Sequence, residues 1–351
     1  MLTRRGVVLR VGLVLGAIAV GLYAERARRW RAASAERANR PAPRPAGVPI
    51  GPFDGKSTAE EVTRGIDLLG RTILVTGVTS GIGLETMRVL ALRGAHVIGT
   101  GRTLQRAREA CASVSGRTTP LMLELTDYPS VVACAKAVRD MGVPLDALIC
   151  NAGVMDLRDL EQVEGIEKQF ATNHLGHFLL TAHLIDCVKE AWQGRVVVVS
   201  SYAMGAADPA GIEWDNLSGK HNYNPRRAYG QSKLANALFA LELARRLEGT
   251  TVTANALHPG LVETKLFRHL PRSLRGYRGI FSPRKLTVEQ GAATTCYVAT
   301  APALAEVSGH FFAACNPNIP DPRATDRVAA ARLWTVSEQL LEPYLQGAAI
   351  G

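Results

Sequence analysis

The residues best suited to chemistry lie in the stretch AYGQSKLANALF, residues 228–239. Apolar residues recur there at helical spacing, so the stretch is predicted to be a helix that carries Tyr229 and Lys233 one turn apart on the same face. A phenol beside an ammonium could exchange a proton with a substrate oxygen, because the positive charge stabilises the phenolate. The alternative is an ordinary pair on an exposed helical stripe. The rest of the chain decides between these two interpretations.

A second candidate site is the glycine-rich stretch VTGVTSGIG, residues 75–83, which follows a predicted strand and opens a predicted helix. A dinucleotide-binding loop requires this position. Gly77 would permit the tight turn, Gly81 would let the backbone approach a pyrophosphate, and Gly83 would let the helix lie close to the sheet. The unpaired N–H groups at the start of the helix would then face the phosphates. The alternative is a glycine-rich turn that binds nothing.

The next predicted strand bears on the choice of dinucleotide. NAD-binding loops of this kind are followed about 20 residues later by a carboxylate that accepts hydrogen bonds from the ribose 2′-hydroxyl. Here the strand ends GTGR, residues 99–102, with no carboxylate. Arg102 could instead pair with a 2′-phosphate through its forked donors, which favours NADP(H). The alternative is a solvated arginine at the end of a strand.

These residues must be positioned by strands and helices. From about residue 57 onward, short runs of β-branched residues, typical of strands, alternate with segments of helical periodicity. Seven strands are predicted, within 72–77, 95–102, 119–125, 146–153, 195–201, 251–259 and 309–314, and one long helix is predicted within 161–190. The run from Val196 to Val199 has no polar residue, so both faces of that strand must be covered, as in a parallel sheet. The pattern therefore predicts an α/β fold: a doubly wound (Rossmann), mostly parallel seven-stranded sheet with helices on both faces and ligand sites at the carboxyl ends of the strands.

Together with YxxxK, the glycine spacing TGxxxGIG resembles that of the short-chain dehydrogenase/reductase family, and the likeness continues along residues 70–315. It is also carried by the CNAG turn, by TNHLGHF, by the serine pair that ends VVVVSS and by the turn in HPGLVETKL. The likeness is strongest to the retinol-dehydrogenase-like branch, in the segments STAEEVTRGIDLLG, TNHLGHF and AYGQSKLAN. That branch includes WW-domain oxidoreductases and plant chloroplast-envelope relatives. No WW-type tryptophan/proline module precedes the domain here.

The resemblance implies roles for four catalytic residues. Tyr229 would exchange a proton with the substrate oxygen, while Lys233 would stabilise the phenolate and hydrogen-bond the nicotinamide ribose. Ser201, the second serine of its pair, would hold the substrate oxygen near Tyr229. Asn173 would anchor a water in a proton relay from Lys233.

The resemblance also implies a larger cofactor-binding set. Its members are Thr76, Gly77, Ser80, Gly81, Ile82, Gly83, Arg102, Glu124, Leu125, Asn151, Ala152, Gly153, Tyr229, Lys233, Pro259, Gly260, Val262 and Thr264. Thr264 would contact the nicotinamide carboxamide or a phosphate, and its alternative role is a helix N-cap. Two residues depart from the family pattern: Cys150 replaces the first asparagine of NNAG, and Glu124 replaces the usual aspartate after the third strand. His258 is interpreted as a packing histidine rather than a general base.

Composition and charge exclude several function classes. The chain has 351 residues, of which 47% are hydrophobic, enough for one large α/β domain with extensions. The net charge is +10, but residues 1–44 hold ten arginines and two glutamates, so residues 45–351 carry only +2 and nucleic-acid binding is not indicated. The six cysteines show no CxxC pair and no ligand-like spacing with histidine, so neither disulfides nor a metal site is expected.

The N-terminal residues predict a membrane anchor. An apolar run covers 11–24 and reaches 19 residues when it is extended back to Gly6, which is just enough to span a bilayer. Seven arginines follow the run and two precede it, so the main domain is expected on the cytoplasmic side of the membrane. The alternatives are a cleaved secretory signal and a twin-arginine export signal.

These features predict a membrane-anchored, NADP(H)-dependent oxidoreductase that acts on a lipophilic alcohol, aldehyde or ketone. The alternative is a cofactor-bound sensor or scaffold in which catalysis is incidental. The predicted parts are the anchor with its basic flank (1–39), a Pro/Gly-rich linker (40–56) and the Rossmann-fold domain (57–351). Substrate specificity is expected in a lid within 265–290 and in the insertion 205–224. The oligomeric state is left open, a homo-oligomer being one alternative.

Overall fold

The computed structural model describes residues 44–262 and 285–348. The chain separates into two compact units, Met1–Arg44 and Pro45–Gly351. The predicted membrane anchor falls in the first unit and lies outside the described residues. Within the described residues, no helix is both long and apolar enough to cross a membrane. The second unit contains all of the predicted site residues.

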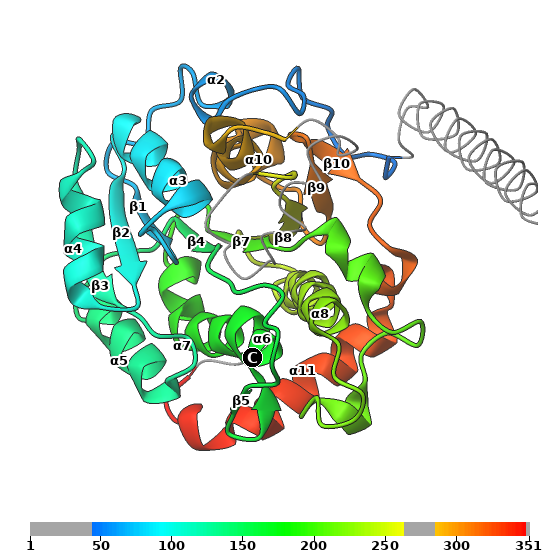
Figure 1. Cartoon of the computed structure of the whole chain (residues 1–351). Helices are drawn as coiled ribbons and strands as arrows, with labels where there is room; N and C mark the ends of the chain where they lie inside the picture. Colours follow the sequence, from blue (N-terminus) through cyan, green and yellow to red (C-terminus); the bar gives the residue numbers. More distant parts are fainter. Residues whose placement is uncertain (1–43, 263–284, 349–351) are drawn as a thin grey trace, which may run out of the picture. The chain divides into compact units, whose positions relative to one another are not determined.

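An eight-stranded sheet forms the centre of the second unit (Figure 1). In spatial order its strands are β10 (Asn316–Asn318), β9 (Phe311–Ala313), β8 (Thr253–His258), β7 (Arg195–Val199), β4 (Ala147–Cys150), β1 (Thr72–Val75), β2 (His96–Gly101) and β3 (Thr118–Met122). All neighbouring strands are parallel except β9 and β10. The strand order reverses at β1, between β4 and β2, and open α/β sheets bind their ligands at such a reversal.

The sheet has eight strands rather than the predicted seven. The additional strand, β10, pairs antiparallel with β9. Ala314 and Cys315 connect the two strands with φ angles of 51° and 57°, which makes a tight hairpin. Such turns are usually marked by asparagine or glycine, and a proline such as Pro317 occurs in strands mainly at sheet edges. No familiar sequence pattern therefore pointed to this strand.

Helices cover both faces of the sheet, as predicted. On one face lie α5 (Tyr128–Arg139), α7 (Gly176–Lys189), α8 (Pro225–Arg246) and α11 (Arg327–Leu341), and on the other lie α2 (Ala59–Val62), α3 (Gly81–Leu92), α4 (Leu104–Ala112) and α10 (Val288–Thr300). In β7, Val196 and Val198 join the first core while Val197 and Val199 join the second. Both faces of this strand are buried, which confirms the expectation from its unbroken apolar run.

Short elements fill the connections. Between β4 and α7 lie the strands β5 (Gln162–Val163) and β6 (Ile166–Glu167), the short helix α6 (Lys168–Phe170) and a π-helical turn, η1 (Ala171–Leu175). The long helix predicted within 161–190 is confirmed, since α6, η1 and α7 follow one another without a gap from Lys168 to Lys189, after the β5–β6 hairpin. In the part of the chain that the structure describes, the 3-10 helices are η2 (Tyr202–Ala206), η3 (Trp214–Asn216), η5 (Pro302–Leu304), η6 (Pro322–Thr325) and η7 (Glu342–Tyr344).

The segment predicted as a linker packs against the domain from residue 45 onward. The Gly51 N–H donates to Asn316 Oδ1 at 3.1 Å, and Asn316 Nδ2 donates to the Phe53 carbonyl at 2.6 Å. The Phe53 ring meets the ring of Tyr297 edge-on, with 5.8 Å between centroids. The compact unit therefore begins at Pro45 rather than at residue 57, because side chains of α10 and β10 provide partners for this Pro/Gly-rich backbone.

Candidate active site

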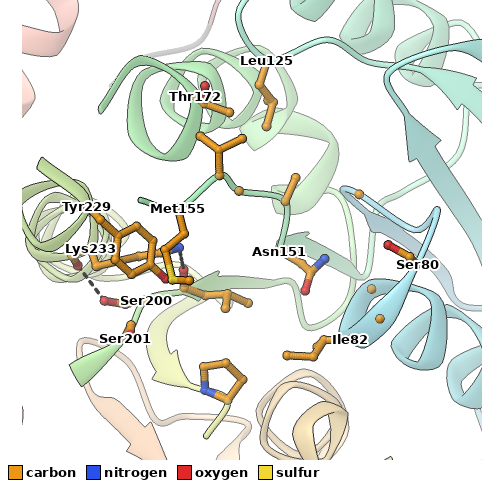
Figure 2. Close-up of a pocket in the computed structure, with 18 of the residues that line it drawn as sticks. Ser80, Ile82, Leu125, Asn151, Met155, Thr172, Ser200, Ser201, Tyr229 and Lys233 are labelled. Atoms are coloured by element: carbon orange, nitrogen blue, oxygen red, sulfur yellow. Dashed lines mark hydrogen bonds between the residues drawn. The ribbon is translucent and has the colours of Figure 1, made fainter. Parts of the chain in front are cut away.

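A pocket of about 440 Å³ opens at the carboxyl ends of β1, β2, β4, β7 and β8. Most of the predicted site residues line it: Gly77, Ser80, Gly81, Ile82, Gly83, Arg102, Glu124, Leu125, Asn151, Ala152, Gly153, Ser201, Tyr229, Lys233, Pro259, Gly260 and Val262. Figure 2 shows Ser80, Ile82 and Asn151 on one side and Ser201 and Tyr229 on the other. Thr76 and Asn173 lie behind the wall of the pocket, and Thr264 lies outside the described residues.

Glycines shape the part of the pocket next to α3. Gly77 and Gly81 have φ angles of 73° and 62°, which other residues rarely adopt. A Cβ on Gly83 would lie 2.5 Å from Asn151 Nδ2 and would overlap the Gly77 carbonyl oxygen, so only glycine fits at this position. Ser80 is the N-cap of α3, but its side chain forms no capping hydrogen bond there. The loop and the helix start form a narrow cradle of N–H groups, which fits a pyrophosphate.

Thr76, which was predicted to contact the cofactor, is fully buried and does not line the pocket. Its hydroxyl accepts hydrogen bonds from the N–H groups of Asn151 and Ala152, both at 2.9 Å, and lies 2.9 Å from His177 Nε2. The Asn151 side chain donates back to the Thr76 carbonyl at 2.8 Å. Thr76 therefore fixes the turn after β4, which lines the pocket in its place.

Arg102 and Glu124 lie at the ends of β2 and β3. Glu124 Oε1 accepts hydrogen bonds from the Thr126 N–H at 3.1 Å and from the Thr126 hydroxyl at 2.8 Å, so this oxygen is engaged within its own turn. Arg102 is exposed at the rim of the pocket. Arg102 therefore places a positive charge at the end of β2.

Tyr229 and Lys233 are buried side chains of α8 on the wall of the pocket (Figure 2). Lys233 Nζ lies 5.8 Å from the centroid of the Tyr229 ring and donates a hydrogen bond to the Val199 carbonyl at 2.9 Å. Burial raises the pKa of Tyr229 above its ordinary value, while the nearby Ser201 side chain opposes this rise. Burial also lowers the pKa of Lys233 to about 8. The two groups are neighbours, and burial is the largest influence on the pKa of each.

The two serines that follow β7 have different environments. Ser200 is buried, and its hydroxyl donates to the Lys233 carbonyl at 2.6 Å. Ser201 is half-buried, and its oxygen accepts a hydrogen bond from the Ala203 N–H at 3.1 Å. Ser201 is also the serine whose side chain lowers the pKa of Tyr229. Ser200 therefore joins α8 to β7, whereas the Ser201 hydroxyl is placed to meet a substrate oxygen beside Tyr229.

Asn173 lies in the π-helical turn and is fully buried. Its Oδ1 accepts from the Val154 N–H at 2.8 Å, and its Nδ2 donates to the Val154 carbonyl at 3.0 Å and to the Ser232 hydroxyl at 2.8 Å. A Cβ on Gly153 would lie 3.0 Å from Asn173 Oδ1 and 3.7 Å from Lys233 Nζ, so these groups converge. The Asn173 side chain holds the turn after β4 against α8, and its place in a proton relay stays a prediction.

The turn after β8 lines the pocket through Pro259, Gly260 and Val262. Val262 pairs with Leu286 in an isolated bridge, which fixes the two ends of the intervening segment. Thr264 and most of the predicted lid, 265–290, fall within 263–284 and lie outside the described residues.

Sixteen pocket-lining residues were not among the predicted site residues, namely Thr79, Thr100, Gly101, Leu123, Thr126, Val154, Met155, Asp156, Lys168, Thr172, Val199, Ser200, Ala203, Arg226, His258 and Leu261. Met155 and Asp156 lie two and three residues after the Asn-Ala-Gly turn, and Arg226 precedes Tyr229 by about one helical turn. Their proximity to recognised motifs could have pointed to them. Thr172 reaches the pocket from a π-helical turn, for which the sequence has no comparable signal.

His258 lines the pocket, but its surroundings are those of a packing residue. Its ring centroid lies 4.5 Å from that of Tyr202, and burial lowers the pKa of His258 to about 4. A histidine with so low a pKa stays neutral near pH 7 and is a weak base. Among the described residues there is no cluster of histidine, cysteine, aspartate and glutamate that could hold a metal ion.

Several known proteins are similar to most of this chain. Residues 71–214 match the family model described as short chain dehydrogenase. Short-chain dehydrogenase TIC 32 A, chloroplastic, of Brassica napus is 42% identical over 302 residues, which cover 83% of this chain and 94% of that protein. Retinol dehydrogenase 12 of Bos taurus is 40% identical over 281 residues, which cover 79% and 88%. A crystal structure of an uncharacterized protein from Mycobacterium Paratuberculosis has a TM-score of 0.66 and 34% identity, covering 80% of this chain and 97% of that one.

Proposed function

We propose that this chain transfers a hydride between NADP(H) and a lipophilic alcohol, aldehyde or ketone. The chain belongs to the short-chain dehydrogenase/reductase family, and it is therefore an oxidoreductase that uses a nicotinamide cofactor. The predicted resemblance to the retinol-dehydrogenase-like branch is confirmed by the relatives above. The observation that carries the proposal is the meeting of Ser201, Tyr229 and Lys233 on one wall of a pocket whose other end is a glycine cradle.

The residues of the cradle fit the proposed cofactor. Gly77, Gly81 and Gly83 leave room for a pyrophosphate against the start of α3, and Arg102 supplies a cation at the end of β2. Tyr229 and Lys233 line the opposite part of the same pocket, where the nicotinamide would lie. When bound, the nicotinamide ring would donate or accept the hydride.

The chain itself contributes orientation and proton transfer. With a raised pKa, Tyr229 keeps its proton at neutral pH, and this is the form that donates to a carbonyl oxygen during reduction. Ser201 would hold the same oxygen through its hydroxyl. Lys233 would stabilise the phenolate that remains. The Lys233 ammonium is oriented by its hydrogen bond to the Val199 carbonyl. Oxidation of an alcohol would use the same groups in reverse.

A lipophilic substrate is proposed on two grounds. The name of the bovine relative states that it acts on retinol, a lipophilic alcohol. In this chain Met155, Ala203 and Leu261 line the same pocket as Tyr229. Apolar groups at this point would exclude water from the reacting carbonyl and bind a hydrocarbon chain.

An NADPH-oxidation assay over long-chain ketones, aldehydes and retinoid-like carbonyl compounds tests the proposed function. We expect turnover of at least one lipophilic member of the panel, together with the reverse reaction on the matching alcohol. If the protein binds NADPH but turns over none of the compounds in either direction, the alternative of a cofactor-bound sensor or scaffold replaces this proposal.

Cofactor preference is expected to depend on Arg102. NADPH should bind at least about tenfold more tightly than NADH, which corresponds to about 1.4 kcal/mol, because one charge-assisted contact to the 2′-phosphate supplies that much. Arg102→Asp should reverse the order, since a carboxylate repels the phosphate and accepts from the ribose hydroxyl. Titration of protein fluorescence with each cofactor measures both affinities.

The matched control for this prediction is Arg108→Asp, which makes the same change of charge on the exposed surface of α4, away from the residues that line the pocket. This variant should keep the preference for NADPH. Equal affinities of the unaltered protein for the two cofactors would refute the assignment. A loss of preference in the control would instead indicate a long-range effect of net charge.

We also propose that the N-terminal segment anchors the protein in a membrane with the catalytic unit in the cytoplasm. The proposal rests on the apolar run 11–24 and the arginines that follow it, and these residues lie outside the described part of the chain. Full-length protein should stay in the membrane fraction after a high-salt wash, whereas a shortened protein beginning at residue 45 should be released. A mature chain that begins near residue 25 and is found beyond the cytoplasmic membrane would favour the export signal instead.

A further inference from the structure

The short helix η2 directly follows Ser201 and determines where its hydroxyl points. The Ala203 N–H donates to Ser201 Oγ at 3.1 Å, and the Met204 N–H donates to the Ser201 carbonyl at 3.0 Å. The position of the serine hydroxyl is therefore coupled to the position of the whole η2 turn. What holds η2 in place also holds Ser201.

One arginine from the C-terminal part of the chain binds the backbone of η2 and of the residues that follow it. Arg323, in η6, donates to the carbonyls of Met204 at 3.3 Å, of Ala207 at 3.2 Å and of Asp208. The first of these carbonyls belongs to η2, and the other two lie near the start of the insertion 205–224. A single guanidinium thus donates hydrogen bonds to three backbone carbonyls of the segment that follows Ser201.

Arg323 is itself oriented by Asp321. The guanidinium donates to Asp321 through Nε and Nη2, both at 2.8 Å, and the Asp321 side chain also accepts from the Arg323 N–H at 3.0 Å. Their side chains are only 24% and 19% exposed, so this forked pair is better shielded from solvent than a surface ion pair. Neither residue lines the pocket.

The η2 turn also rests on α8, at the residue that follows Tyr229. A Cβ on Gly230 would lie 2.6 Å from the Ala207 nitrogen and 2.8 Å from the Ala203 carbonyl oxygen. The turn therefore contacts the helix backbone with no side chain between them. Because η2 is pressed against α8 at Gly230, any shift of η2 changes the distance between Ser201 and Tyr229.

We propose that Asp321 and Arg323 form a positioning pair for the substrate-binding serine, holding η2 against α8 so that the Ser201 hydroxyl stays within reach of Tyr229 and the substrate oxygen. This inference rests on the proposed function, because it assigns the pair an effect on the reaction at Ser201. Arg323 touches neither substrate nor cofactor. It acts on catalysis through the backbone of residues 204–208.

The test compares Arg323→Ala and Arg323→Lys with the unaltered protein at a temperature where all are folded. Arg323→Ala should lower kcat by about 10- to 100-fold, as expected for misplacement of a catalytic group by about an ångström, while NADPH affinity and KM change by no more than about twofold. Arg323→Lys should be intermediate, because an ammonium cannot reproduce the forked pair with Asp321 together with three carbonyl contacts. Hydrogen–deuterium exchange should rise in the peptide 202–208 in both variants.

The matched control is Arg245→Ala, which removes an arginine that binds the Glu242 carboxylate at 2.7 and 3.0 Å near the end of α8. Glu242 keeps Arg246 as a partner at 2.9 Å, so this variant should retain kcat and the exchange pattern of 202–208. If Arg323→Ala retains kcat as fully as the control does, the proposal is overturned. Equal losses of kcat and NADPH affinity would overturn it too, because they indicate general damage.

Two further results keep the proposal open to refutation. If Arg323→Ala does not fold, Asp321→Asn replaces it, since asparagine keeps an oxygen to accept the Arg323 N–H but removes the charge; unchanged kcat in that variant overturns the proposal. If the unaltered protein turns over no carbonyl compound, the proposed function fails. In that case unchanged exchange in 202–208 on loss of the arginine shows that the pair does not hold η2 either.

Discussion

Tyr229→Phe is expected to lower kcat by on the order of 100-fold or more, with the fold and the affinity for NADPH preserved. The substitution removes the hydroxyl that would exchange the proton and leaves the buried ring in place. The Tyr229 carbonyl still accepts from the Ser232 hydroxyl at 2.8 Å, so the helix loses no backbone contact. Steady-state rates with the best carbonyl compound, together with a cofactor titration and a thermal melt, measure all three quantities.

Tyr202→Phe is the matched control for this experiment. The Tyr202 ring lies 4.5 Å from His258 and 5.7 Å from Phe311 between centroids, and phenylalanine keeps both contacts. Turnover should therefore remain close to normal in this variant. Near-normal turnover in Tyr229→Phe would show that the tyrosine is structural and would remove the central residue of the proposed mechanism.

The fold followed from the sequence wherever periodicity and burial coincide. The run Val196–Val199 predicted a strand covered on both faces, and the two cores meet on its alternate side chains. The edge strand β10 was missed because Pro317 and the positive φ angles of Ala314 and Cys315 are unusual for a hairpin. The pairing of β10 depends on its contacts with β9, and a local sequence pattern does not show such contacts.

The fixed segment ahead of α2 was missed for a related reason. Its composition is that of a linker, and its partners, Asn316 and Gln290, lie more than 230 residues further along the chain. Asn316 uses both the donor and the acceptor of its amide on this segment, and Gln290 Nε2 donates to the Lys56 carbonyl at 2.9 Å. Whether a polar segment docks depends on such distant partners.

At the site, the motifs located the pocket wall but could not separate the residues that line it from those that support it. Cys150 stands where the family pattern has an asparagine, so one supporting hydrogen bond of the turn after β4 is expected to be absent. In the structure Cys150 is buried, and its sulfur lies 3.9 Å from the Thr181 hydroxyl. The Thr76 hydroxyl accepts the hydrogen bonds from the N–H groups of the turn instead. Side-chain hydrogen bonds between strands are set by the register of β1 and β4, which the sequence alone does not specify.

The structure indicates that Lys233 lowers the stability of the protein. Its ammonium is buried, and burial lowers the pKa of Lys233 to about 8 from an ordinary value of 10.5. A decrease of this size corresponds to a cost of roughly 3 kcal/mol for keeping the charge in the folded protein at neutral pH. Retaining such a group is expected where function requires it.

Lys233→Met is therefore expected to abolish most activity and yet to stabilise the fold. The methionine side chain has a similar length and carries no charge into the core. The Val199 carbonyl loses Lys233 Nζ but keeps Asn236 Nδ2 as a donor at 3.1 Å, so no buried acceptor is left without a partner. After subtraction of the lost hydrogen bond, the free energy of unfolding at pH 7 should rise by about 1–2 kcal/mol. Turnover should fall by on the order of 100-fold, and NADPH should bind more weakly.

The pH dependence distinguishes this explanation from better packing of the methionine. Below pH 8 the lysine is protonated in both the folded and the unfolded chain, so the unaltered protein bears the full cost of the buried charge. Between pH 8 and 10.5 the unfolded chain binds a proton that the folded protein has released, so the unaltered protein gains stability relative to Lys233→Met as the pH rises. Urea unfolding of both proteins from pH 6 to pH 10 measures this difference, in which the other titrating groups largely cancel. A stability difference that stays constant across this range would show that the Lys233 charge carries no such cost.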